Sequence, residues 1–345
     1  MMLNYKNRNA LKQTSHIYGF ILSAMIGILS VCSCIKEEAG TVLPYITFGV
    51  TDVAADTKAL ITNETLNSSA TSVTVYGVRN NTEQIFKGVT IKKRTDSYNW
   101  EPENSSNKRV WSSGSYSFYG YTFSSGQTAC TVQKEGLKII VTQPASYLET
   151  NMVDYMLSHT YKVADGTSNH IVMLYMQHAM ACAEIIVKKQ IHEHEVTLKS
   201  ISLNGIYRSA TMECEDQANA NSGEYNVWKT QISGDADAQY TKEFTPAQAQ
   251  GNTLGTMTIL AVPQQLTQAT ELTVVYSVDE DNNDSTDPIK YTDVFKLFDY
   301  TPYVWESGHK IRYTLNINTG VELQAEIVDW IAAGYIEGVI FPSGE

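Results

Sequence analysis

The sequence has few cysteines, and their spacing matches neither a disulfide framework nor a zinc site. Its 345 residues contain five cysteines. Cys32 and Cys34 lie close together near the N-terminus, whereas Cys130, Cys182 and Cys214 are scattered. A disulfide framework needs an even, regularly spaced set, and a zinc site needs paired ligands close together in sequence. We therefore expect mostly buried thiols, with one disulfide left open, and a fold that depends on packing for its stability.

Motifs of the common enzyme classes are also absent. There is no nucleophile elbow, no phosphate-binding loop, no metalloprotease helix motif and no dinucleotide-binding glycine pattern. The segment "IHEHE" (191–195) offers only two histidines to a metal. The segment "DEDNND" (279–284) begins no EF-hand, because the sixth position lacks glycine and the twelfth lacks glutamate. We predict a protein that is not an enzyme and has no metal or cofactor.

Positive charge is scarce, and so are long apolar runs. The chain has 25 Lys and Arg residues against 37 Asp and Glu residues, a formal net charge of −12. Nucleic acid is therefore not an expected partner, since phosphate binding needs a basic face. The main apolar stretch, residues 17–31, is shorter than the ~20 residues that a membrane-spanning helix requires.

This apolar stretch has the features of a secretory signal peptide. The sixteen residues before it are basic and contain no acid, and "VCSC" ends it at residues 31–34. A basic segment, a short apolar core and small residues favour a signal peptide over a buried core helix. "VCSC" resembles the bacterial lipobox. We predict removal of residues 1–33 by cleavage between Ser33 and Cys34, with Cys34 rather than Cys32 carrying the lipid.

Residues 34–44 would then form a tether at the membrane surface. Several acyl chains anchor a protein stably, whereas one chain holds it only marginally. Lys36, Glu37 and Glu38 follow the lipidation site. They are either a solvated tether or an export signal that directs lipoproteins to the outer face of the outer membrane. The expected location is the outer membrane, at the cell surface or within a fimbrium.

The rest of the chain has the pattern of an all-β protein. Apolar and polar residues alternate with a period of two in many short segments separated by polar turns. These segments are 72–78, 115–123, 137–143, 182–191, 196–207, 256–262, 271–278 and 310–317. Residues 310–327 predict a hairpin with Gly320 in its turn. Residues 150–159 fit a short helix or an irregular loop.

Length and composition favour two domains in tandem. The chain beyond residue 33 is longer than a domain with a single hydrophobic core usually is. The polar segment "VADGTSN" (163–169) is a plausible boundary. We predict an N-terminal β-sandwich over 45–165 and a C-terminal β-sandwich over 166–330.

The C-terminal tail, residues 331–345, is apolar on both faces of an extended strand. Tyr335, Val339 and Phe341 share one face, and Ile336 and Ile340 share the other. Such a strand must be buried by something. It is either the last strand of its own sandwich or a donor strand for a neighbouring subunit.

An ordered set of segments resembles one family. The set is "YITFGV", "DTKALI", "VWSSGSYSFYGYTF", "VDYMLS", "VMLYMQHAMACAEIIV", "LAVPQQL" and "YVWESGHKIRYTLNI…VDW". It is similar to the fimbrillin-like proteins, the subunits of lipoprotein-derived type V pili, from about Tyr45 to Trp330. The resemblance implies two transthyretin-like β-sandwich domains. It also implies assembly by strand exchange after proteolytic removal of an N-terminal strand.

The chain departs from the family pattern at the maturation site. Stalk subunits are cut after an early arginine, but here no arginine occurs between Cys34 and Arg79, and Lys58 takes that place. Either Lys58 is cut, or the subunit keeps its strand and lipid as an anchor or accessory protein. The predicted function is a structural or accessory pilus subunit that supports adhesion, with other pilus subunits as partners. The alternative is a surface lipoprotein that binds glycan or host protein without polymerising.

Overall fold

The chain is all-β in the part that the computed structural model describes, as the sequence predicts. The described residues are 45–52, 66, 68, 71–95, 99–124, 130–133, 138–166, 170–191, 193–214, 228–245, 251–280, 287–318 and 320–329. Within these residues, short 3-10 helices interrupt the strands at η1 (Ser105–Asn107), η3 (Glu149–Asn151) and η5 (Leu297–Asp299). Among these residues, no helix has the length and apolar character needed to cross a membrane.

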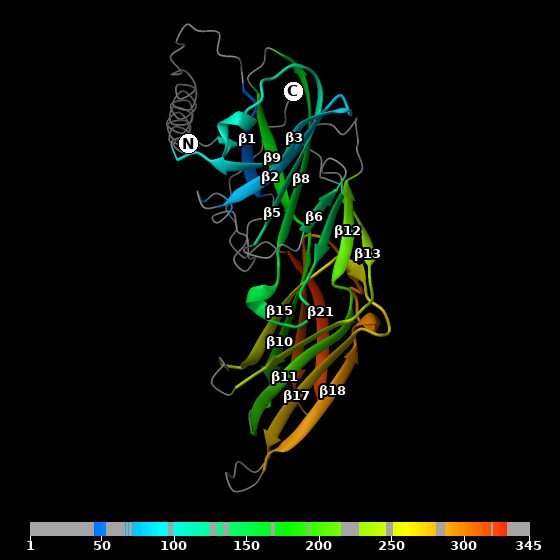
Figure 1. Cartoon of the computed structure of the whole chain (residues 1–345). Helices are drawn as coiled ribbons and strands as arrows, with labels where there is room; N and C mark the ends of the chain where they lie inside the picture. Colours follow the sequence, from blue (N-terminus) through cyan, green and yellow to red (C-terminus); the bar gives the residue numbers. More distant parts are fainter. Residues whose placement is uncertain are drawn as a thin grey trace, which may run out of the picture. The chain divides into compact units, whose positions relative to one another are not determined.

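Seven strands close into a barrel in the order β1-β4-β3-β2-β5-β8-β9. Figure 1 shows most of them together in blue to green. Their bounds are β1 (Thr47–Asp52), β2 (Ser72–Arg79), β3 (Glu83–Lys93), β4 (Trp100–Pro102), β5 (Ser113–Phe123), β8 (Tyr155–Asp165) and β9 (Ile171–His178). The neighbours pair antiparallel except β1 and β9, which run parallel and close the barrel.

Two four-stranded sheets make up most of the C-terminal half. One sheet has the order β15-β10-β20-β21, and the other has the order β14-β11-β17-β18. The first contains β15 (Thr253–Ala261), β10 (Ala181–Lys189), β20 (His309–Ile317) and β21 (Val321–Asp329). The second contains β14 (Ala238–Glu243), β11 (Glu195–Ile206), β17 (Glu271–Asp279) and β18 (Ile289–Lys296). Their apolar faces share one core, which is the arrangement of a β-sandwich.

A third four-stranded sheet joins segments from both halves of the sequence. Its order is β13-β12-β7-β6. The strands are β13 (Trp228–Ser233), β12 (Ser209–Cys214), β7 (Lys138–Thr142) and β6 (Cys130–Gln133). Two short strands, β16 (Gln264–Gln265) and β19 (Val304–Trp305), pair antiparallel with each other as a separate small sheet.

The buried apolar residues form two clusters, one of them inside the barrel. Phe48, Phe86 and Phe118 meet there, with ring centroids 5.6 Å apart for Phe48 and Phe86 and 5.7 Å apart for Phe48 and Phe118. Trp100 and Trp111 belong to the same cluster. The second cluster lies between the sheets of the C-terminal half and includes Ile185, Leu203, Val274 and Tyr313.

Strand β5 contributes to both clusters because both of its faces are covered. Tyr116 and Phe118 point into the barrel cluster, while Tyr119 and Tyr121 belong to the second one. Every residue from Tyr116 to Thr122 is consequently buried. A strand covered on both faces has no need for polar alternation.

The predicted boundary at residues 165 and 166 falls between two strands of the barrel. β8 precedes the boundary and β9 follows it, yet both belong to the closed sheet. β7, from the first half of the sequence, pairs with β12 from the second half. We therefore propose that the N-terminal domain extends through His178.

The hairpin predicted near the C-terminus is present. β20 pairs antiparallel with β21 from His309 with Asp329 to Ile317 with Val321. The helix or irregular loop predicted over residues 150–159 was wrong in its second half. Residues from Tyr155 onward begin β8, and only Glu149–Asn151 form a helical turn, of the 3-10 type. Burial on both faces of β8 removes the alternation that identifies a strand.

Candidate functional site: the position of strand β1 in the barrel

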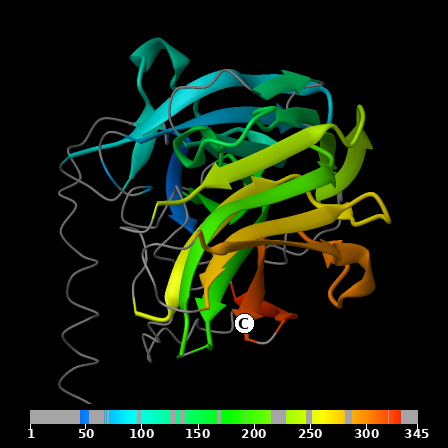
Figure 2. The same cartoon turned by 90° about the horizontal axis from the view of Figure 1, so that it is seen from below.

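Strand β1 closes the barrel between β9 and β4. It pairs with β9 in parallel over six residues, from Thr47 with Ile171 to Asp52 with Met176. It pairs with β4 at Phe48 and Trp100 only. The neighbouring backbone adds a hydrogen bond from the Ile46 amide to the Arg109 carbonyl, 2.8 Å long. In Figure 1, β1 is the blue strand labelled beside β9, and Figure 2 shows it from below.

The side chains of this segment alternate in the way that a half-buried strand requires. Ile46, Phe48 and Val50 point into the barrel and are 1%, 0% and 7% exposed. Full burial of such side chains stabilises the fold by about 1.5–3 kcal/mol each before entropy is counted. Without this segment, the barrel would lose three core side chains and would expose a backbone edge on β9.

On the outer face of β1, Gly49 lies under a side chain of β9. A Cβ atom added at Gly49 would lie 2.4 Å from the Sδ atom of Met173. The absence of a side chain at Gly49 therefore lets Met173 lie against the β1 backbone. A larger residue at this position of a strand would require the flexible Met173 side chain to shift.

The chain re-enters the same core soon after β1. Leu66 is fully buried in the barrel cluster. Lys58, the predicted maturation site, lies between β1 and Leu66 in sequence and falls outside the described residues. A cut after Lys58 would separate β1 from the rest of the chain. Leu66 would remain in the larger fragment, covalently joined to the other barrel strands.

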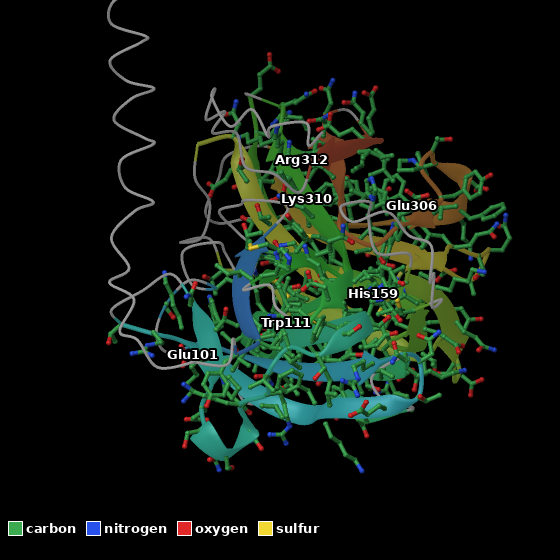
Figure 3. The ribbon with its side chains drawn as sticks, turned by 90° about the horizontal axis from the view of Figure 1, so that it is seen from above. Glu101, Trp111, His159, Glu306, Lys310 and Arg312 are labelled. Carbon is green, nitrogen blue, oxygen red and sulfur yellow. The ribbon has the colours of Figure 1, made fainter. Side chains whose placement is uncertain are left out.

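A charged cluster lies on β4 and the segments next to it. The carboxylate of Glu101 is 2.7 Å from Lys108 Nζ and 3.2 Å from Arg94 Nη1. Burial opposes ionisation of Glu101, but hydrogen bonds from Lys108 and Arg94 outweigh it, so the pKa of Glu101 is below its usual value. Lys108 also lies over the ring of Tyr45, 5.7 Å from its centroid. Figure 3 labels Glu101 and Trp111 of this region.

Several predicted functional residues fall outside the described part of the chain. They are Ser33, Cys34, Lys58 and the tail residues Tyr335, Ile336, Val339, Ile340 and Phe341. The described chain stops at β21, an edge strand that precedes the tail. The side chains of Cys182 and Cys214 are buried, as the sequence predicts. Among the described residues, no three His, Cys, Asp or Glu side chains gather as a metal site.

Sequence reasoning identified "YITFGV" as an apolar segment but did not find its partner. Its partner strand, β9, lies more than a hundred residues later in the sequence. The only available signal was the apolar run "HIVMLYM", which directly follows the polar segment taken as a domain boundary.

The comparisons with known proteins agree with this architecture. A family model described as fimbrillin-like matches residues 57–330. That range covers most of the chain, so the chain belongs to the fimbrillin-like family. A comparison with curated protein sequences gave no match.

Solved structures share the fold at low sequence identity. A proposed cell adhesion protein from Bacteroides uniformis ATCC 8492 matches with a TM-score of 0.53 and 11% identity, over 83% of this chain and 99% of its own. A proposed cell adhesion protein from Bacteroides ovatus ATCC 8483 matches with a TM-score of 0.53 and 14% identity, over 84% of this chain and 99% of its own. At these identities, the matches establish the fold.

Proposed function

We propose that this protein is a structural or accessory subunit of a cell-surface pilus, exported as an outer-membrane lipoprotein and assembled by strand exchange. The position of β1 is the observation that carries the proposal. β1 is a short N-terminal strand that closes a barrel and precedes a candidate cleavage site. Removing it would leave a groove with unpaired backbone groups and empty side-chain positions, which an incoming strand can fill.

The C-terminal tail has the composition of such an incoming strand. If the tail is extended, its sequence would place Ile336 and Ile340 on one face and Tyr335, Val339 and Phe341 on the other. The β1 position takes three inward side chains at alternate residues, those of Ile46, Phe48 and Val50. In extended form the tail could supply two of these three side chains together with the backbone ladder, either Val339 and Phe341 or Ile336 and Ile340 with Gly338 between them.

The experiment combines limited proteolysis with electron microscopy. Brief trypsin treatment of the folded chain should cut after Lys58 before it cuts the sheets, and the cut protein should form fibres. Lys58→Gln should resist this cut and remain monomeric. The pair Ile336→Asp and Ile340→Asp should be cut normally but form no fibres, because two charges would enter an apolar groove.

Ile327→Asp is the matched control, since it places the same charge on β21 at a side chain that is 57% exposed. It should leave fibre formation unchanged. Fibres that form equally well from the tail variant would contradict the donor-strand proposal. Resistance of Lys58 while sites within the sheets are cut would favour the anchor or accessory role, in which β1 and the lipid at Cys34 are retained.

A further inference from the structure

A shallow groove on the C-terminal half is distinct from the β1 position. Two adjoining hollows form it, with volumes of about 440 and 430 Å³, and Gln265 lines both. One hollow has Tyr207, Ile232 and Phe298 in its wall. The other has Trp228 in its wall. We call this pair of hollows the Gln265 groove.

The apolar part of the Gln265 groove consists mainly of partly exposed rings. Tyr207, Phe298 and Trp228 are each half-buried, so part of each ring is accessible. Tyr207 and Trp228 pack on the C-terminal core with their other side. Aromatic rings held in this way offer flat apolar surfaces at little cost in side-chain entropy.

The polar groups of the groove are amides and hydroxyls rather than cations. Gln265, Thr267 and Gln268 line the first hollow, and the described residues in its wall include no charged side chain. The second hollow adds Glu306 and His309, and no described Lys or Arg lines either hollow. Figure 3 labels Glu306. In a chain with a net charge of −12, such a groove does not attract an anionic ligand.

Hydrogen bonds hold the floor of the groove in place. The Gln264 carboxamide accepts from the Tyr207 amide at 2.8 Å and donates to the Tyr207 carbonyl at 3.0 Å. The Leu266 amide donates to the Tyr303 carbonyl at 2.8 Å. These hydrogen bonds occupy the side-chain carboxamide of Gln264, whereas the neighbouring Gln265 is exposed and lines both hollows. A floor held in this way loses little entropy when a ligand binds.

The described lining consists of flat rings and neutral donors and acceptors, with no Lys or Arg among its residues. This lining favours a ligand that is uncharged, rich in hydroxyls and apolar on its ring faces. We propose that the Gln265 groove binds a neutral oligosaccharide, with sugar rings against Tyr207 and Phe298 and sugar hydroxyls on Gln265. This site is independent of the proposed strand exchange.

The test uses the full chain, purified in detergent, and isothermal titration with neutral hexasaccharides of glucose, mannose, xylose and N-acetylglucosamine. At least one of them should bind. Phe298→Ala and Gln265→Ala should each weaken that binding at least tenfold. Tyr207→Ala should do the same, whereas Tyr207→Phe should restore most of the affinity because it keeps the ring.

Phe123→Ala is the matched control, because it removes an exposed ring from β5 in the barrel. It should leave the affinity unchanged, and circular dichroism should show that all variants are folded. The proposal fails if none of the four sugars binds, or if the groove variants bind as the wild type does. It also fails if heparin or a synthetic peptide of residues 330–345 occupies the groove in place of the sugars.

Discussion

At the scale of single residues, Glu184 is a buried carboxylate held between two cations. It lies on β10 and is 2% exposed. Its carboxylate accepts hydrogen bonds from Lys310 Nζ at 2.9 Å and Arg312 Nε at 2.8 Å, both on β20. Figure 3 labels the two cations. Burial opposes ionisation of Glu184, but the hydrogen bonds from Lys310 and Arg312 outweigh it, so the pKa of Glu184 is below its usual value of 4.5.

The lowered pKa of Glu184 predicts how stability depends on pH. Its stabilising effect is fully present above the ordinary pKa and is lost as the pH falls through the lower pKa of the folded state. Glu184→Gln leaves two cations without their buried partner and should cost about 3 kcal/mol in unfolding free energy at neutral pH. This difference from the wild type should shrink in acid. Urea unfolding of both proteins at a series of pH values from neutral to acid measures it.

Glu326→Gln is the control for this prediction, because Glu326 contacts Arg312 at 3.5 Å with its own side chain 59% exposed. Its loss should cost less than about 1 kcal/mol. An equal cost for both variants, or a gap that stays constant in acid, would contradict the role assigned to Glu184.

At the scale of elements, β1 is the strand whose packing can be tested most directly. Phe48→Ala should lower the unfolding free energy by about 3–5 kcal/mol, because it leaves a cavity among Phe86 and Phe118. Thr47→Ala, on the outer face of the same strand, should change it by less than about 0.5 kcal/mol. Tryptophan fluorescence reports on the transition, since Trp100 and Trp111 belong to the same core.

If Phe48→Ala prevents folding, Phe48→Leu provides a milder test, with a cost of roughly 1.5 kcal/mol. A cost below that of Thr47→Ala would mean that β1 contributes little to the stability of the barrel.

Sequence reasoning found strands with one polar face and also β5, over 115–123, although both faces of β5 are covered. Alternation over 72–78, 271–278 and 310–317 corresponds to β2, β17 and β20. β8 was missed because its first residues are buried on both faces, and Tyr155 and Met156 form, with the preceding Met152, a spacing that suits a helix as well. The parallel pairing of β1 with β9 could not be predicted from the sequence, since alternation within a segment carries no information about a distant partner strand. The candidate site was therefore half predicted: its segment was found, but its place in a closed barrel was not.

At the scale of the whole molecule, the two cores predict unequal local stability. Phe48→Ala should speed amide hydrogen exchange in barrel strands such as β3 by about a hundredfold, the equivalent of about 3 kcal/mol. Strands of the sandwich core, such as β17 and β20, should exchange as in the wild type. β5 contributes to both cores and should show an intermediate effect. Equal acceleration in all strands would mean that the chain unfolds as one cooperative unit.

The pairing of β1 also bears on the polarity of a fibre. β1 runs parallel to β9 and antiparallel to β4, so the two edges beside it are not equivalent. A donor strand that restores both sets of hydrogen bonds must run in the direction of β1. Every subunit would then receive its neighbour in one orientation, and a contact of this head-to-tail kind that does not close into a ring produces an open filament. Such a filament has two different ends, one with an unfilled groove and the other with an unused strand, and it can grow only where one of these is still vacant.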